Sequence, residues 1–232
     1  MLEVSIGTGR NLEYYDFDFK GYNGVGKPVK GEKGLKRGNV KSFTALDKSA
    51  EMLEVAHEKF SGMFPGILGV RWVIADAACE DEIPAPPKNA NERGGNVEGG
   101  KYDTIIQTMG LCSCADPVKL LRSLGGMLKE EEGRILLLEH GRGWWGWLNG
   151  ILDRGAEGHA REFGCWWNRD LGRIVGESGL VVVEERRVGW HGGTTWCFEL
   201  KKPRGEEKKD GPVKFAIEEV EKTEETKKKG WW

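Results

Sequence analysis

The stretch Leu2-Glu3-Val4-Ser5-Ile6-Gly7-Thr8-Gly9, with Arg10-Asn11-Leu12 after it, decides how this chain is expected to fold. The short apolar run predicts a buried strand, the glycines predict a tight turn, and the following residues resemble the start of a helix. Small residues in such a turn let the backbone approach a ligand closely. A single G-x-G is weak evidence because many turns contain one, so the rest of the chain has to support it.

Further β-type runs follow along the chain, at residues 42–46, 70–75, 102–107, 134–138, 180–187 and 194–201. Helical patterns lie between them, at residues 49–60, 116–126 and 168–178. This alternation predicts an α/β fold, a Rossmann-like doubly wound seven-stranded sheet with an antiparallel last strand, in three α/β/α layers. Residues 134–138 are so continuously apolar that we expect helices on both faces of this strand.

The 232 residues predict one domain over residues 1–201 and a charged low-complexity tail over residues 202–232. A short docking helix near residues 213–222 is the alternative for part of the tail. Residues 16–41 and 84–100, rich in Gly with Lys or Pro, are expected to be flexible insertions. Because the chain opens inside a predicted strand, we expect that an N-terminal portion is missing, and with it any membrane anchor or targeting signal.

Charge and cysteine content exclude several function classes. Lys and Arg number 35 against 37 Asp and Glu, so no overall basic excess favours nucleic-acid binding, although the local basic segment 27–37 leaves RNA as an alternative. Five scattered cysteines indicate a reducing compartment. Cys112 and Cys114 form a C-x-C without a second pair, so we predict buried small side chains and no metal site. No apolar run reaches the roughly 18 residues that span a bilayer.

Two acidic residues, Asp47 and Asp76, each end a predicted strand that follows the glycine turn. The carboxyl ends of parallel strands meet at one edge of a doubly wound sheet, where such folds bind their ligands. A carboxylate after the second strand is also suited to hold ribose hydroxyls. Alone, Asp47 is equally compatible with capping the helix near Ser49, and Asp76 with an ordinary loop.

This ordered set resembles the class I S-adenosylmethionine-dependent methyltransferases, over roughly residues 1–201. Glu3 to Gly9 is similar to their first motif, E/D-x-G-x-G-x-G, except at Ser5, where the family usually has glycine. The resemblance implies the cofactor S-adenosyl-L-methionine and a turn that holds its methionine part. It implies these further cofactor contacts: Asn11 on the turn, Asp47 at the ribose, Lys48 and Met52 beside the adenine, Asp76 and Ala77 at the adenine amino edge, and Gln107 facing the methyl donor.

Within this superfamily, residues 103–178 resemble the branch of animal methyltransferase-like proteins that methylate alkyl thiols and of fungal mitochondrial inner-membrane methyltransferases. The matching segments are Leu111-Cys112-Ser113, Leu138-Glu139-His140, Trp147, Leu152-Asp153, Gly164-Cys165 and Arg169. The branch implies a small, apolar acceptor such as a thiol, a mitochondrial location at the inner membrane and an N-terminal membrane-associating segment. The cytoplasm is the alternative location, and the similarity to quinone-pathway C-methyltransferases is weaker.

His140 is the candidate for removing a proton, because imidazole titrates near neutral pH and the residue follows a central strand. The alternative is a plain hydrogen bond to a neighbouring loop, and a thiol acceptor needs less help from a base. A dense group of tryptophans follows the same strand, and it predicts either the wall of an apolar substrate pocket or packing in the core or against a membrane. These are Trp144, Trp145, Trp147, Trp166 and Trp167.

Three other functions stay open at this point. A non-catalytic interaction module is compatible with Ser5 and the lysine-rich insertion, and an RNA methyltransferase is compatible with the basic segment. An NAD-dependent oxidoreductase is disfavoured, because Gly7-Thr8-Gly9 is followed by Arg10-Asn11-Leu12 and completes no G-x-G-x-x-G. The sequence predicts a small-molecule substrate but not its identity, nor an oligomeric state.

Overall fold

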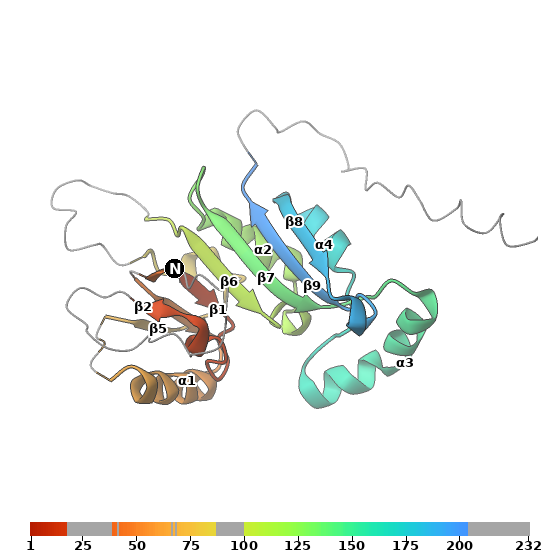
Figure 1. Ribbon diagram of the computed structural model, residues 1–232, viewed down its shortest axis with the longest axis horizontal. Coiled ribbons are helices and arrows are strands. Elements are labelled where there is room, and N and C mark those ends of the chain that lie inside the picture. The colour runs from red at the N-terminus through yellow and green to blue at the C-terminus, as the bar shows by residue number, and fades with distance from the viewer. Residues whose placement is uncertain (18–38, 41, 66, 68, 87–99, 204–232) are drawn as a thin grey trace, which may run out of the picture.

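A seven-stranded sheet forms the centre of the molecule in the computed structural model, which describes residues 1–17, 39–40, 42–65, 67, 69–86 and 100–203 (Figure 1). The strand order is β5-β4-β1-β6-β7-β9-β8. The first five strands are parallel, and β9 is inserted antiparallel to both β7 and β8. The predicted sheet and its antiparallel last strand are confirmed. The strands are β1 (Leu2–Val4), β4 (Thr44–Asp47), β5 (Arg71–Ile74), β6 (Thr104–Thr108), β7 (Arg134–His140), β8 (Val181–Arg187) and β9 (Thr195–Lys201).

The helices begin where polar side chains cap them. Ser49 accepts a hydrogen bond from the Met52 amide at 3.2 Å and starts α1 (Ala50–Met63), and Asp116 accepts one from the Lys119 amide at 2.9 Å before Pro117 in α2 (Pro117–Gly126). The other helices are α3 (Gly146–Phe163) and α4 (Leu171–Ser178), with the 3-10 turns η1 (Leu12–Tyr14), η2 (Glu80–Glu82), η3 (Leu111–Ser113) and η4 (Gly189–His191). None of the helices in the described part of the chain has the length and apolar character to cross a membrane.

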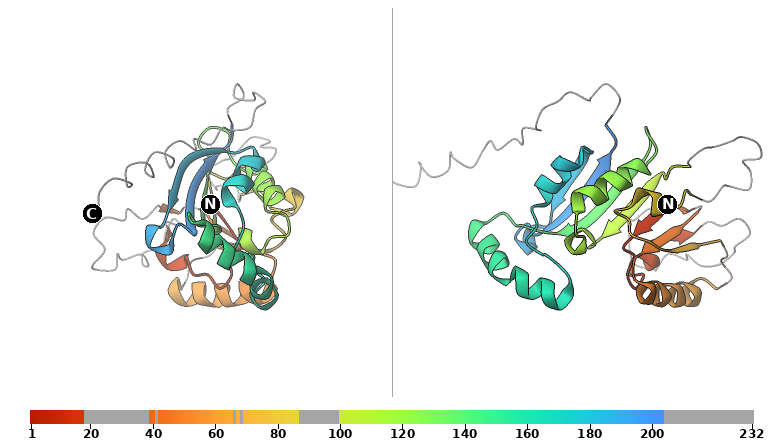
Figure 2. Two further views of the ribbon diagram at one scale, coloured as in Figure 1. Left: turned by 90° about the vertical axis from the view of Figure 1, so that its right-hand side faces the viewer. Right: turned by 180° about the vertical axis from the view of Figure 1, so that it is seen from behind.

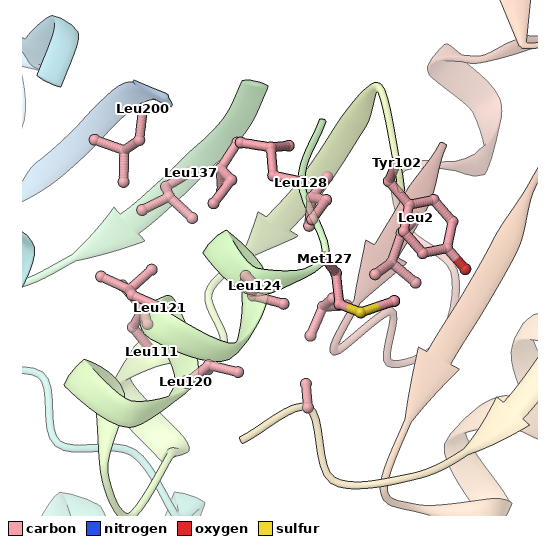
Figure 3. Packing of buried hydrophobic residues seen from close by; sticks show 14 of the residues in the cluster. Leu2, Tyr102, Leu111, Leu120, Leu121, Leu124, Met127, Leu128, Leu137 and Leu200 are labelled. Carbon is pink, nitrogen blue, oxygen red and sulfur yellow. The ribbon is translucent and has the colours of Figure 1, made fainter. Parts of the chain in front are cut away.

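The apolar residues form two cores, one on each face of the sheet. The larger core joins α2 and α4 to β1, β6, β7 and β9, and Figure 3 shows Leu121 and Leu124 of α2 beside Leu137 of the sheet. The smaller core packs α1 against β4 and β5 on the opposite face, so the molecule has three layers (Figure 2). Burying each of these side chains contributes about 1.5–3 kcal/mol.

The expectation that helices cover both faces of residues 134–138 is wrong. Ile135 and Leu137 are buried under α2 and α4, but Leu136 is half-buried and Leu138 is 37% exposed. The reason is the position of α1, which packs mainly against β4 and β5. A continuous apolar run therefore does not by itself establish cover on both sides.

Helix α3 is an 18-residue element that the sequence analysis did not predict. Four glycines interrupt its pattern and only Ala156 of its residues is buried, so it lacks the apolar stripe by which a helix is recognised. It begins after Trp145, ends at Gly164 with a left-handed φ of 67°, and lies beyond the end of β7 (Figure 1). Conversely, the described residues after β1 form the 3-10 turn η1, where the start of a helix was expected.

The predicted insertion 16–41 is wrong at its two borders. Residues 16–17 form β2 (Asp16–Phe17), which pairs in parallel with β3 (Asn39–Val40), and Phe17 and Val40 are buried in the smaller core. Aromatic contacts explain this, since Phe17 touches the rings of Phe43, Phe60 and Phe64. The rest of that insertion, the basic segment, residues 87–99 and the chain from residue 204, with the alternative helix 213–222, lie outside the described residues. The domain boundaries at residues 1–201 and 202–232 therefore stay a prediction.

Candidate functional site

The turn after β1 carries three left-handed residues: Ser5, Gly7 and Gly9, with φ of 53°, 55° and 71°. A side chain added at Gly7 would meet nothing within 4 Å, so this backbone faces open space. A Cβ on Gly9 would lie 2.5 Å from Leu12 Cδ1 and 3.3 Å from Ala56, so close packing against α1 requires this glycine. Ser5 adopts this conformation at a cost of about 1–2 kcal/mol, whereas glycine adopts it freely.

Asp47 joins the turn to the start of α1. Its Oδ2 accepts a hydrogen bond from the Gly7 amide at 2.9 Å, and its Oδ1 accepts one from the Ser49 amide at 3.0 Å. The two amides therefore fix the orientation of the Asp47 carboxylate. Each of its oxygens can accept a second hydrogen bond, for example from a hydroxyl group of a ligand.

Asp76 shapes the chain after β5 in a similar way. Its Oδ1 accepts a hydrogen bond from the Ala78 amide at 2.9 Å, and its own amide donates to Glu82 Oε2 at 2.9 Å. The two bonds bend the chain away from the sheet at the buried Ala77. The acids that follow β4 and β5 thus lie at one edge of the sheet, as predicted.

These segments surround a cleft of about 510 Å³, a size typical of small-molecule sites. Seven of the predicted cofactor contacts line it: Ser5, Gly7, Asp47, Lys48, Met52, Asp76 and Ala77. Leu46, Ala75, Ala78 and Cys79 extend this wall. The structure therefore brings the ends of β1, β4 and β5 together around a single cleft.

Four predicted contacts do not line this cleft: Glu3, Gly9, Asn11 and Gln107. Glu3 is 2% exposed and its Oε1 accepts a hydrogen bond from Asn11 Nδ2 at 2.9 Å; burial raises the pKa of Glu3 to about 7. Asn11 also donates to Thr108 Oγ1 at 3.0 Å, and so joins the turn to the end of β6. Gln107 is fully buried, and neither of its amide atoms has a hydrogen-bond partner among the described residues. A cofactor contact by these four stays a prediction.

The opposite wall follows β6, and the sequence analysis did not assign it to the site. It consists of Met109, Gly110, Ser113, Cys114, Ala115, Asp116, Lys119 and Leu120. Met109 has a left-handed φ of 54°, and a Cβ on Gly110 would overlap Gln107 Nε2 and lie 2.8 Å from Ser5 Oγ. The sequence indicates this wall only through the short link between the predicted strand that ends at Gln107 and the helix that starts at Asp116-Pro117.

A fully buried acid, Glu139 of β7, holds this second wall in place. Its Oε1 accepts hydrogen bonds from the Gly110 amide at 2.9 Å and the Leu111 amide at 3.2 Å. Burial raises the pKa of Glu139 to about 8, although these two amides and Arg169 favour the charged form. Glu139 therefore positions the second wall. The sequence analysis named Glu139 only as part of a segment that resembles the methyltransferase branch.

A family model described as a methyltransferase domain matches residues 1–185, which include every residue that lines the cleft. The chain belongs to the methyltransferase domain family. This methyltransferase domain is 41% identical over 212 residues to the mitochondrial methyltransferase OMS1 of Saccharomyces cerevisiae, over 90% of this chain and 40% of the relative. The chain thus spans about two fifths of the length of that relative.

Solved structures share the fold of this methyltransferase domain at low sequence identity. Magnesium protoporphyrin IX methyltransferase from Synechocystis PCC 6803, crystallised with bound SAH, is 14% identical, with a TM-score of 0.52 over 87% of this chain and 73% of its own. The YcgJ protein of Bacillus subtilis is also 14% identical, with a TM-score of 0.53 over 88% of this chain and 92% of its own. These matches establish a Rossmann-like methyltransferase fold.

Two groups predicted to act on the acceptor lie away from the cleft wall of this methyltransferase domain. His140 is half-buried, its Nε2 lies 2.8 Å from Cys165 Sγ, and burial together with His159 lowers the pKa of His140. None of the five tryptophans lines the cleft, and core packing is wrong for Trp144, Trp145 and Trp147, which are 50%, 47% and 65% exposed. The role of His140 in proton removal stays a prediction.

Proposed function

We propose that this methyltransferase domain binds S-adenosyl-L-methionine in the cleft and transfers its methyl group to a small acceptor. The observation that carries the proposal is the convergence of the Gly7 turn, Asp47 and Asp76 around one cleft of about 510 Å³. Family membership supports the reaction class. The similarity to a relative of which the chain spans two fifths supports the same chemistry for the whole protein.

The residues of the cleft fit the parts of this cofactor. The open backbone at Gly7 leaves room for the methionine part, and the preset carboxylate of Asp47 suits ribose hydroxyls. In this proposal, Lys48 and the thioether of Met52 flank the adenine and Asp76 with Ala77 meets its amino edge, and all four residues line the cleft.

The chain contributes mainly alignment to the reaction. When bound, the cofactor supplies an electrophilic methyl group for an in-line displacement. The cleft would hold the cofactor and the acceptor close together, and this alignment would lower the barrier to transfer. Leu46, Met109 and Leu120 supply apolar side chains to the cleft wall.

The acceptor in this proposal is a small, apolar nucleophile such as a thiol. The branch resemblance of residues 103–178 supports it, and thiolates are already partly populated at neutral pH. The name of the yeast relative supports a mitochondrial location for this protein. Association with the inner membrane is a further part of the proposal.

Calorimetric titration of the folded chain with S-adenosylhomocysteine tests the cofactor assignment. We expect saturable binding that Asp47→Ala weakens by about 2–3 kcal/mol, roughly 30-fold to 150-fold, because two charged hydrogen bonds are lost. Asp103→Ala is the matched control, since Asp103 is exposed and its carboxylate pairs with Lys129 at 2.6 Å away from the cleft. A folded chain that binds no S-adenosylhomocysteine would contradict the proposal.

Transfer assays with labelled cofactor and separate panels of thiols, quinone precursors and RNA then identify the acceptor. A non-catalytic module is the second candidate function, and the left-handed Ser5 in the cofactor turn is the observation that favours it. Such a module gives no transfer with any panel, even when the chain and the cofactor associate.

A further inference from the structure

Three metal-ligating side chains from distant segments meet beside the second wall of the cleft. Cys112 lies in η3, His140 ends β7, and Cys165 follows the residue that ends α3. Their ligand atoms all lie within 4.8 Å of one another. Within the part of the chain that the structure describes, no other group of three or more His, Cys, Asp or Glu side chains is placed in this way.

The backbone holds the three residues in this arrangement. The Trp166 amide donates to the Cys112 carbonyl at 3.0 Å, which fixes the segment after α3 against η3. Gly164 turns the chain through its left-handed conformation, and His159 Nδ1 lies 2.8 Å from the Cys165 carbonyl. His140 is paired with Thr195 of β9 in the sheet. Backbone hydrogen bonds and strand pairing therefore hold the three residues close together.

The chemistry of the three side chains suits a borderline or soft cation. Cys112 and Cys165 are only 2% and 7% exposed. The Cys112 thiol donates a hydrogen bond to the Met109 carbonyl at 3.5 Å, and its sulfur also lies at hydrogen-bond distance, 3.6 Å, from Ser113 Oγ. Burial first and then the neighbouring Cys112 raise the pKa of the Cys165 thiol. Two thiolates and one imidazole are a donor set that zinc prefers.

We propose that Cys112, His140 and Cys165 bind one Zn²⁺ ion, with the fourth coordination position open. With Zn–S of about 2.3 Å and Zn–N of about 2.0 Å, tetrahedral ligand atoms lie about 3.5–3.8 Å apart. The present separations, from 2.8 Å between His140 Nε2 and Cys165 Sγ up to 4.8 Å, reach those values through shifts of about 1 Å. Binding releases the two thiol protons to solvent, and the ion replaces them as the partner of both sulfurs.

The proposed ion links three elements that are separate in the chain. It ties η3, which carries part of the second cleft wall, to the end of β7 and to the segment after α3. A coordinated imidazole nitrogen no longer accepts a proton, so zinc binding and proton removal through that nitrogen of His140 exclude each other. The sequence did not reveal the site, because its ligands are single residues and Cys114 of the C-x-C motif does not belong to it.

Zinc titration of the full chain, kept reduced and first stripped with a chelator, tests the site without reference to methyl transfer. A chromophoric chelator as competitor reports the affinity, and Co²⁺ reports the ligands through thiolate charge-transfer bands. We expect one ion per chain and a loss of affinity of at least tenfold in Cys112→Ser, Cys165→Ser and His140→Ala. Cys197→Ser is the matched control, because Cys197 lies half-buried in β9 outside the cluster, and it should bind as the wild type does.

Thermal unfolding provides a second readout, since an ion that binds only the folded state raises Tm. Excess zinc should raise Tm of the wild type and of Cys197→Ser but not of the three ligand variants. No zinc binding by the folded, reduced chain, or binding that the three variants do not weaken, overturns the proposal. A Cys112–Cys165 disulfide that persists under reductant, found by thiol counting, also overturns it. S-adenosylhomocysteine binding, measured separately on zinc-free protein, shows whether the cofactor assignment fails independently.

Discussion

The two walls of the cleft are built on different physical principles. The first wall, after β1, β4 and β5, presents a backbone turn and the carboxylates of Asp47 and Asp76 directly to the cleft. The second wall, after β6, depends on Glu139, which does not line the cleft but holds the Gly110 and Leu111 amides from the core. The difference indicates that changes in the first wall alter ligand affinity, whereas changes behind the second wall alter stability.

Glu139→Ala should give the largest effect. It leaves two amides buried without an acceptor, so we expect the free energy of unfolding to fall by about 3 kcal/mol. Urea unfolding followed by circular dichroism measures it. Glu139→Gln keeps an acceptor oxygen at the same place and should be much closer to the wild type. Equal losses in the two variants would show that the hydrogen bonds to Gly110 and Leu111 do not hold the wall.

Asp76→Ala should change affinity and leave stability nearly unaltered. We expect S-adenosylhomocysteine to bind roughly tenfold more weakly, which corresponds to about 1.4 kcal/mol, because one charged hydrogen bond is lost. Asp81→Ala is the matched control, since Asp81 is exposed in the neighbouring η2 and does not line the cleft. If Asp76→Ala lowers Tm strongly but leaves binding intact, the contrast between the two walls is wrong.

The pH dependence of stability should reveal the buried acids. Burial raises the pKa of Glu3 to about 7 and of Glu139 to about 8, from 4.5 in the unfolded chain. Between pH 4.5 and 8 the folded state therefore holds more protons than the unfolded state, so the contribution of these groups to stability falls as pH rises. Urea midpoints at several pH values should show this decline, and Glu139→Gln should reduce its slope. An unchanged slope would mean that Glu139 is ionised in the folded protein.

Ser5→Gly should give the smallest effect, in the favourable direction. It relieves the left-handed strain at Ser5, partly offset by the greater freedom of glycine in the unfolded chain, so we expect a net gain of about 0.5 kcal/mol. Ser61→Gly is a control of opposite sign, because an exposed helical serine that becomes glycine loses about 0.5 kcal/mol of helix propensity. Differential scanning calorimetry distinguishes the two, and a destabilising Ser5→Gly would contradict the strain argument.

The first wall was predictable because its residues directly follow strands. Strand ends are marked by apolar runs that stop at Asp47 and Asp76, and parallel strands bring their carboxyl ends to one edge. The sheet with its antiparallel last strand and the helices that start near Ser49 and Asp116 came from the same local signals. Each of these inferences needs only neighbouring residues in the sequence.

The second wall was not predictable because its contacts cross the fold. Glu139 looks like an ordinary surface acid in sequence, yet it is fully buried and reaches Gly110 in another loop. Cys165 meets His140 only because α3, a helix without an apolar stripe, turns the chain back at Gly164. The continuous apolar run also predicted helices on both faces of residues 134–138, yet Leu138 is partly exposed because α1 packs mainly against β4 and β5.

Gly110, Gln107 and Ser5 share one small volume, since a Cβ on Gly110 would collide with the other two side chains. The order in which mutations arise at these positions therefore matters, because a residue larger than glycine at position 110 becomes tolerable only after its neighbours have shrunk. Ser5→Gly removes one of these two steric clashes, and the buried amide of Gln107 then still clashes with a larger residue at position 110. Directed evolution of a wider cleft should accordingly start at position 5, proceed to position 107 and reach position 110 last.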